Sequence, residues 1–339
     1  MCGIVGYIGG TRAVAAGLDC LRQLEYRGYD SAGAAFFDAR SGSIAAVKAV
    51  GRVELLAEKL DTSTPSGLAI FHTRWATHGR VSEVNAHPHD DCGGIVWVVH
   101  NGIVENYKEL REALAKSGHR FRSETDTEVI PHLIEEALRL YPFEEAVRLA
   151  LQKIRGTYGL VAISGKDPGV LVAARNFSPL LVGIGNGEYI VASDASAVLK
   201  HTKNVMYLDD GEMAVLTPAG HRVFDLGRNH REKQTHEIEW SPEQAQKSGH
   251  PHFMLKEILE EPEAIENSLR GRLLAEEGKA KLGGLVEVAH ALRYAQRILI
   301  AACGTAYLAG RIGEYMFEEY AGIPVKTDIA SEFRYRKPV

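Results

Sequence analysis

The sequence predicts an α+β fold that is followed by the beginning of a second, α/β domain. Apolar runs of strand length alternate with amphipathic helical segments over about the first 225 residues. Residues 227–249 then form a polar segment that contains Pro242 and shows no sustained apolar period. The full length of 339 residues also exceeds what a single core usually holds. We therefore predict a first domain over 2–226, a linker over 227–249 and a second domain over 250–339.

The strands of the first domain are predicted from short runs rich in β-branched and aliphatic residues. Several of these runs are apolar at consecutive positions, which is typical of strands covered on both faces. The runs lie at 68–73, 95–100, 160–164, 170–175, 189–192, 205–208 and 212–216. A further strand is expected to begin at Ile4. Mixed sheets sandwiched by helices are the simplest assembly of these elements.

Three helices are predicted between these strands. Residues 12–24 place apolar side chains on one face, and residues 107–116 stop before Gly118, a natural C-cap position. Residues 127–141 follow Ser123, Thr125 and Asp126, any of which can cap a helix.

The second domain is predicted to contain one βαβ unit. A helical stretch at 253–274, interrupted or restarted near Pro262, precedes a strand at 297–302, a helix at 306–319 and a strand at 323–329. A doubly wound sheet normally needs more strands, so we expect this part to be incomplete.

Composition excludes several classes of protein. Apolar residues make up 45% and the net charge is −5, so no broad basic field favours nucleic acid as a partner. No membrane span or signal peptide is indicated, and we expect a cytoplasmic location.

The four cysteines lie far apart in the sequence and form no CxxC pair; they are Cys2, Cys20, Cys92 and Cys303. This spacing argues against disulfides and against a thiolate zinc site. We expect no cofactor and no metal.

Cys2 is the candidate nucleophile. If Met1 is removed, the residue carries a thiol and a free α-amine on one carbon. An α-amine with a pKa of about 7.7–8.0 can take the proton of a thiol whose pKa is about 8.5. N-terminal-nucleophile hydrolases use this arrangement. A cysteine that follows Met by chance is the alternative.

Five further sequence motifs support the interpretation of Cys2 as the nucleophile. They are LEYRGYDSAG at 24–33, HTRWATHG at 72–79, NAHPH at 85–89, VHNGIVENY at 99–107 and SETDTEVI at 123–130. Together with the opening Met-Cys-Gly-Ile, they resemble the class II glutamine amidotransferases in order and approximate spacing. The resemblance implies a four-layer αββα sandwich of the N-terminal-nucleophile hydrolase type and L-glutamine as substrate.

The same resemblance implies roles for individual residues. Asn101 and Gly102 would form the oxyanion hole, which amide hydrolysis requires; an ordinary Asn-Gly hairpin turn is the alternative. Arg74, with Thr77 and His78, would bind the α-carboxylate of glutamine, and Asp126 its α-ammonium group. A helix N-cap is the other possible use of Asp126. Trp75 would gate the path of ammonia, or it is a core aromatic.

A zinc hydrolase is a rival class. Histidines at 72, 78, 87, 89 and 100 lie near Asp90 and Asp91, and HPHDDC at 87–92 could bind a metal. No HExxH motif or paired cysteines accompany them, and the same histidines fall inside the amidotransferase blocks. Metal catalysis is therefore disfavoured.

Among class II enzymes, the chain most resembles the glucosamine-6-phosphate synthases. HTRWATHG, HFMLKEILEEPEAI at 252–265 and ILIAACGTAYLAG at 298–310 carry this resemblance, which implies the start of a sugar-isomerase (SIS) domain. Fructose 6-phosphate would be the acceptor, Thr305 would bind its phosphate at a helix N-terminus, and the complete enzyme would be a homodimer through this domain. A structural β–α turn is the alternative for Thr305. A glutaminase without synthase activity, and a non-enzymatic sugar-phosphate sensor, are the alternative functions.

Overall fold

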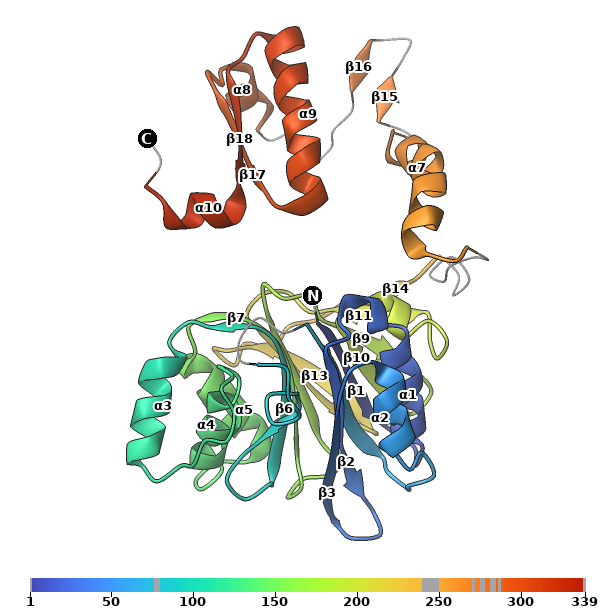
Figure 1. The fold of residues 1–339 in the computed structure, drawn as a ribbon, viewed down its shortest axis with the longest axis vertical. Coiled ribbons are helices and arrows are strands. Elements are labelled where there is room, and N and C mark those ends of the chain that lie inside the picture. The colour runs from blue at the N-terminus through green and yellow to red at the C-terminus, as the bar shows by residue number, and fades with distance from the viewer. Residues whose placement is uncertain are drawn as a thin grey trace. The chain divides into compact units, whose positions relative to one another are not determined.

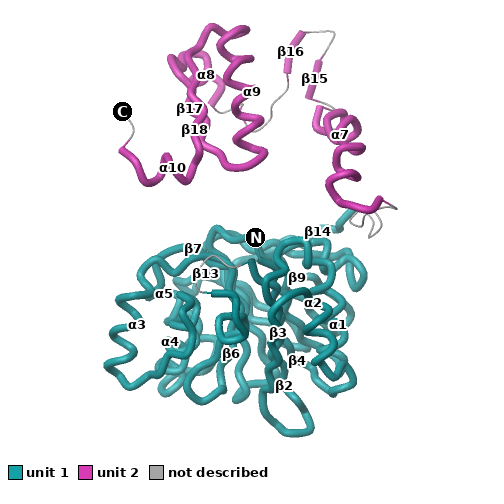
Figure 2. The backbone as a smooth tube through the Cα atoms, in the orientation of Figure 1, with its two compact units in different colours: residues 1–249 teal, residues 250–339 magenta. Residues whose placement is uncertain are grey.

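The computed structural model describes residues 2–75, 80–239, 250–269, 272–274, 278–280, 285 and 288–337. The chain divides into two compact units, residues 1–249 and 250–339 (Figure 2). None of the described helices is long and apolar enough to cross a membrane.

The first unit contains two large sheets. The eight-stranded sheet has the order β14 (His236–Glu237), β11 (Asn204–Tyr207), β9 (Leu181–Ile184), β10 (Tyr189–Ala192), β1 (Gly3–Ile8), β4 (Leu68–Arg74), β2 (Ser31–Asp38) and β3 (Ser43–Val50). The six-stranded sheet has the order β13 (Gly220–Asp225), β12 (Glu212–Thr217), β8 (Leu171–Asn176), β7 (Gly156–Ser164), β6 (Val96–Val104) and β5 (His89–Asp90).

Helices cover the outer faces of the two sheets (Figure 1). Helices α1 (Ala13–Arg22) and α2 (Val53–Lys59) pack on the eight-stranded sheet. On the six-stranded sheet lie α3 (Tyr107–Lys116), α4 (Val129–Ala137) and α5 (Phe143–Lys153). A third apolar cluster, which includes Ile4, Ile70 and Val161, fills the space between the sheets. The predicted αββα sandwich is confirmed.

Two expectations for the first unit were wrong. Every pairing between the named strands of the two large sheets is antiparallel, so the sheets are not mixed. Continuous apolar runs arise here because each sheet is covered by helices on one face and by the other sheet on the opposite face. Residues 227–239, expected in the linker, belong to the first unit: β14 pairs with β11, and Ile238 is buried.

The second unit contains the predicted βαβ arrangement. Strands β17 (Ile298–Ala302) and β18 (Val325–Ile329) form a parallel pair joined by α9 (Gly304–Ala321). Helix α7 (Phe253–Leu269) runs through Pro262 instead of breaking there, because its leucine, glutamate and alanine neighbours are strong helix formers. The remaining elements are α8 (Ala289–Arg293), α10 (Ala330–Tyr335) and the short pair β15 (Leu273–Leu274) and β16 (Lys279–Ala280).

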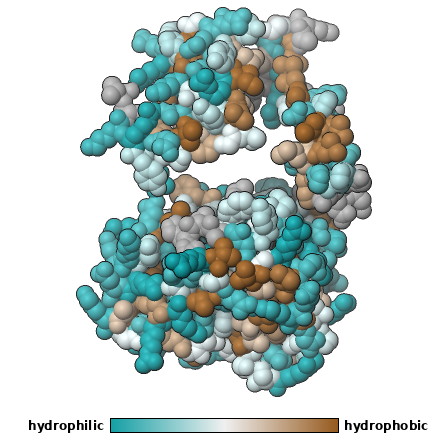
Figure 3. Space-filling view, viewed as in Figure 1, coloured by the Kyte–Doolittle hydropathy of each residue, from teal (hydrophilic) through white to brown (hydrophobic). Residues whose placement is uncertain are grey.

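The second unit buries little apolar surface. Of its described apolar side chains, only that of Val325 is buried. Leu308, Ile312, Tyr315 and Tyr320 of α9 are largely exposed, and apolar side chains reach the surface of this unit in Figure 3. Two strands and one crossover helix supply too few neighbours to cover these side chains.

Candidate active site

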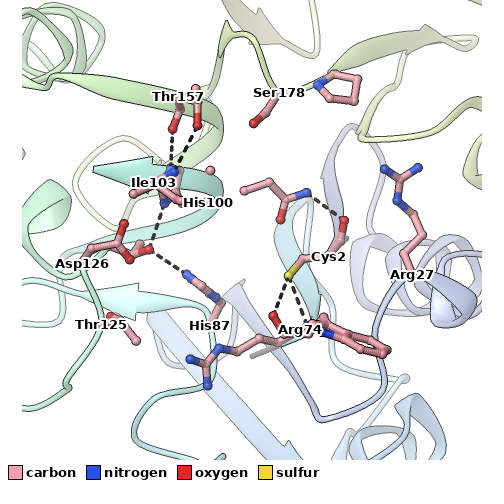
Figure 4. A pocket seen from close by; sticks show the side chains of 15 residues that line it. Cys2, Arg27, Arg74, His87, His100, Ile103, Thr125, Asp126, Thr157 and Ser178 are labelled. Atoms are coloured by element: carbon pink, nitrogen blue, oxygen red, sulfur yellow. Dashed lines mark hydrogen bonds between the residues drawn. The ribbon is translucent and has the colours of Figure 1, made fainter. Parts of the chain in front are cut away.

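A cavity of about 300 Å³ lies in the first unit, where β1, β4 and β6 bring their polar residues together. Six of the predicted site residues line it, namely Cys2, Arg74, Trp75, Asn101, Gly102 and Asp126 (Figure 4). Thr77 and His78 lie outside the described residues. Thr305 lies in the first turn of α9, in the other unit.

Cys2 is held immediately before β1. A side chain at Gly3 would place its Cβ 2.7 Å from Leu24 Cβ and 2.8 Å from Thr73 Cγ2, so glycine lets β1 pack closely beside β4. The backbone N–H of Trp75 donates to Cys2 Sγ at 3.2 Å. Burial raises the pKa of the Cys2 thiol, while the contact with Trp75 and the positive charge of Arg74 oppose that rise. The thiol therefore needs a base to become a thiolate near neutral pH.

Asn101 is fixed between Cys2 and His72. Its Nδ2 donates to the Cys2 carbonyl oxygen at 2.9 Å, and its Oδ1 lies 3.0 Å from His72 Nε2. Because the amide oxygen accepts, His72 carries its proton on Nε2. Burial lowers the pKa of His72 to about 3, so the ring is neutral at physiological pH. Both ends of the amide are thus oriented.

Gly102 continues β6 rather than forming a hairpin turn, which removes that alternative for the Asn-Gly pair. Its φ is +138°, and a Cβ would lie 2.0 Å from the carbonyl oxygen of Thr157. A larger residue would have to displace β7.

Arg74 and Asp126 bring opposite charges to the cavity. Both side chains are almost fully buried, and Asp126 Oδ2 accepts the backbone N–H of Val104 at 2.7 Å. Burial lowers the pKa of Arg74, whereas the carboxylates of Asp30 and Asp126 oppose that shift. Helix α4 begins at Val129 with Glu128 at its N-cap, so Asp126 is not the cap of this helix.

Trp75 is not a core aromatic, because 46% of its surface is exposed. Its ring makes an edge-on contact with Tyr29, with 5.3 Å between ring centroids. Of these two residues, Trp75 lines the cavity.

Buried histidines form the wall of the cavity. Thr127 Oγ1 lies 3.0 Å from His87 Nε2 and 2.9 Å from His100 Nδ1, and His100 Nε2 lies 3.2 Å from the Thr157 carbonyl oxygen. Since that carbonyl only accepts, His100 donates from Nε2, Thr127 donates to His100, and His87 donates to Thr127. Burial lowers the pKa of His87 and His100. These rings are used in hydrogen bonds with threonine, which does not support the rival zinc-hydrolase hypothesis.

The comparisons with known proteins agree with this geometry. A family model described as a glutamine amidotransferase domain matches residues 72–200. Glutamine–fructose-6-phosphate aminotransferase (isomerizing) of Chlorobaculum tepidum is 46% identical, over 100% of this chain and 56% of the relative. The enzyme of that name from Thermus thermophilus is 48% identical, over 100% of this chain and 55% of the relative. Over its whole length, this chain is similar to the glutamine–fructose-6-phosphate aminotransferases.

The chain spans just over half the length of these relatives. Glutamine phosphoribosylpyrophosphate amidotransferase from B. subtilis, at 20% identity, shares the fold with a TM-score of 0.60, over 100% of this chain and 69% of that one. A structure titled as the allosteric regulatory enzyme of purine biosynthesis matches equally well, with a TM-score of 0.60 at 21% identity, over 96% of this chain and 65% of that one.

Several residues of the cavity were not predicted in this amidotransferase domain. They are Arg27, His87, His100, Ile103, Thr125, Thr127, Thr157, Ser178 and Pro179. Most lie inside the sequence blocks that carry the resemblance, so the blocks could have suggested them. Thr157, Ser178 and Pro179 lie outside every block, and only the pairing of β6 with β7 and of β7 with β8 brings their segment to the cavity.

Proposed function

We propose that the first unit hydrolyses L-glutamine to glutamate and ammonia, with the Cys2 thiol as nucleophile. One observation carries this proposal: Asn101 Nδ2 donates a hydrogen bond of 2.9 Å to the carbonyl oxygen of Cys2. Both residues line the same cavity as Arg74 and Asp126. A nucleophile, an amide donor and two opposite charges are the groups that hydrolysis of a free amino-acid amide requires.

The reaction proceeds in two halves. After removal of Met1, the α-amine of Cys2 takes the thiol proton while Sγ attacks the amide carbon of glutamine. The tetrahedral intermediate collapses as the amine returns a proton to the leaving nitrogen, which departs as ammonia and leaves a thioester. Water, deprotonated by the same amine, then attacks the thioester and releases glutamate, and the thiol recovers its proton.

Asn101 and Gly102 stabilise the oxyanion. A primary amide carries two N–H bonds, and the contact with Cys2 uses one of them, so the other serves the developing charge. The backbone N–H of Gly102 is the second donor in this proposal. Because the amide of Asn101 is already oriented by Cys2 and His72, little reorganisation is needed during reaction.

Arg74 and Asp126 select free glutamine. A guanidinium pairs with the α-carboxylate, which Thr77 and His78 help to bind, and a carboxylate accepts from the α-ammonium group. Glutamine within a peptide lacks both charges, so it cannot make these two charge-assisted contacts and should bind more weakly.

In the whole protein, we propose that ammonia passes by Trp75 to fructose 6-phosphate and yields glucosamine 6-phosphate. The names of the relatives support this acceptor. Thr305, in the first turn of α9, would bind the phosphate group, since helix N-termini favour anions. We also propose that the whole protein is a cytoplasmic homodimer.

Measuring both products of this chain tests the proposal. After incubation with glutamine and fructose 6-phosphate, we expect glutamate but no glucosamine 6-phosphate, because β17 and β18 alone do not form the crevice between strand ends in which a doubly wound sheet binds its ligand. Glutamate and the amino sugar are assayed separately by mass spectrometry. An absence of glutamate formation would contradict the proposed glutaminase, and the amino sugar would contradict our interpretation of the second unit.

Replacing Asn101 with alanine removes one oxyanion donor. We expect kcat for glutamine hydrolysis to fall by about 10²–10³-fold with a smaller change in KM, because the lost interaction is made mainly in the transition state. Asn106→Ala is a matched control, since Asn106 also bonds backbone groups but does not line the cavity. Equal losses in both variants would show that the effect is structural.

A further inference from the structure

A second cluster of reactive side chains lies away from the Cys2 cavity. Cys92 follows β5, His119 follows α3, and His132 and Glu135 lie on α4. One ligand atom from each residue lies within 4.8 Å of the other three. The amidotransferase chemistry proposed above uses none of these four residues.

The distances within this Cys92 cluster fit a tetrahedral metal ion. Cys92 Sγ lies 3.7 Å from both His119 Nδ1 and His132 Nδ1. Glu135 Oε2 lies 2.9 Å from His119 Nδ1 and 3.3 Å from His132 Nδ1. A tetrahedral zinc ion with bonds of about 2.3 Å to sulfur and about 2.0 Å to nitrogen separates these two atoms by about 3.5 Å.

The outer nitrogens of the two imidazoles give an independent reason to expect a metal. His119 Nε2 and His132 Nε2 are buried without a hydrogen-bond partner. If both rings are neutral and donate from Nδ1 to Glu135, both Nε2 atoms are buried acceptors without donors. A metal on Nδ1 moves each proton to Nε2, which lies 3.5 Å from Glu136 Oε1 and 4.0 Å from Glu128 Oε1. Carboxylates in this outer position commonly orient metal-binding histidines.

Charge and access also suit a divalent ion. A thiolate and a carboxylate balance the two positive charges of zinc, and the histidines bind as neutral rings. The backbone N–H of Arg120 lies 3.5 Å from Cys92 Sγ and would stabilise a thiolate. Both histidines are buried, whereas Cys92 is exposed and leaves a path by which the ion can enter.

We propose that Cys92, His119, His132 and Glu135 bind one zinc ion in a four-coordinate structural site. One thiolate, two imidazoles and one carboxylate form a complete tetrahedral set, which is typical of structural rather than catalytic zinc. The ion joins the β5–β6 loop to α4 and to the segment that follows α3. Residues 123–127, which include Asp126, lie in sequence between His119 and His132, so the site braces the loop that supplies one wall of the cavity.

Cobalt(II) provides a direct spectroscopic test. The full chain is prepared in a Cys2→Ala background, so that the N-terminal thiol and amine cannot chelate the ion together, and is freed of metal with a chelator. We expect one equivalent of cobalt(II) to produce the intense visible bands of four-coordinate cobalt and a thiolate-to-cobalt charge-transfer band. Zinc should displace the cobalt and erase both.

Variants locate the site. Cys92→Ser should abolish the charge-transfer band, whereas Cys303→Ser, which removes another exposed thiol, should leave it intact. Glu136→Gln should weaken zinc binding by about tenfold, because it removes an outer carboxylate. Glu135→Gln should weaken zinc binding more than Glu136→Gln does. If Cys92→Ser fails to fold, the two glutamine variants decide the question.

Thermal unfolding supplies a second readout. Saturating zinc should raise the Tm of the first unit by about 5 °C in the Cys2→Ala background and leave that of the Cys92→Ser variant unchanged. Failure to bind a stoichiometric metal ion, or a charge-transfer band that persists without Cys92, would overturn the proposal and leave a hydrogen-bonded polar cluster.

Discussion

Glutamine hydrolysis falls by at least about 10⁴-fold when Cys2 is replaced by alanine, because no other group in the cavity replaces a thiol that forms the covalent intermediate. The cavity, the orientation of Asn101 and both charged groups are retained in this variant, so glutamine should still bind. Steady-state glutamate production and binding of glutamine by calorimetry separate the two effects.

Cys303→Ala is the control for this substitution. Cys303 is an exposed thiol in the second unit, and its loss should leave glutamate production unchanged. Turnover by Cys2→Ala above about one part in ten thousand of the original rate would contradict the assignment of the nucleophile.

An uncleavable extension before Cys2 should lower turnover by about 10²–10⁴-fold, which is the usual contribution of a general base. The extension converts the α-amine into an amide nitrogen, which cannot accept the thiol proton. Since burial raises the pKa of the Cys2 thiol, little thiolate exists at neutral pH without a base. The same extension placed at the C-terminus is the control, and mass spectrometry establishes the N-terminal residue of each preparation.

Full activity in the N-terminally extended protein would show that a different base serves Cys2. The nearby imidazoles are poor candidates for this role. His87 and His100 are engaged with Thr127, and burial lowers their pKa.

Apolar patterns in the sequence predicted those helices and strands whose pattern matches their burial in the structure. The βαβ unit was recognised because an apolar run, a turn and an amphipathic helix follow one another in the sequence. The β2–β3 hairpin was not predicted, since its alanine-rich strands lack a strong alternating period. Helix α5 was also not predicted, although its sequence is amphipathic. The antiparallel pairing of the sheets could not be deduced either, because burial on both faces gives the same apolar run in either orientation.

Site residues were predicted where a single short sequence motif contains all the groups that one step of the chemistry needs. Cys2 and the Asn101–Gly102 pair are examples, and the structure brings both to the cavity. Ser178 and Thr157 were missed, because only strand pairing over long sequence distances brings them there. The Cys92 cluster was missed for the same reason. Its ligands span 92–135 without any regular metal-binding spacing, and only the packing of α4 beside the β5–β6 loop brings them together.

Covalent labelling with an electrophilic glutamine analogue tests the central claim most directly. The analogue keeps the α-amino and α-carboxylate groups and carries a diazoketone in place of the amide, so a thiol in the glutamine site is alkylated with loss of nitrogen. Intact-mass and peptide-mass analysis should find a single adduct on Cys2, formed more slowly in excess glutamine and absent from Cys2→Ala. An adduct on Cys92 or Cys303, or an unmodified Cys2 in the native protein, would contradict the assignment of this cavity as the glutamine site.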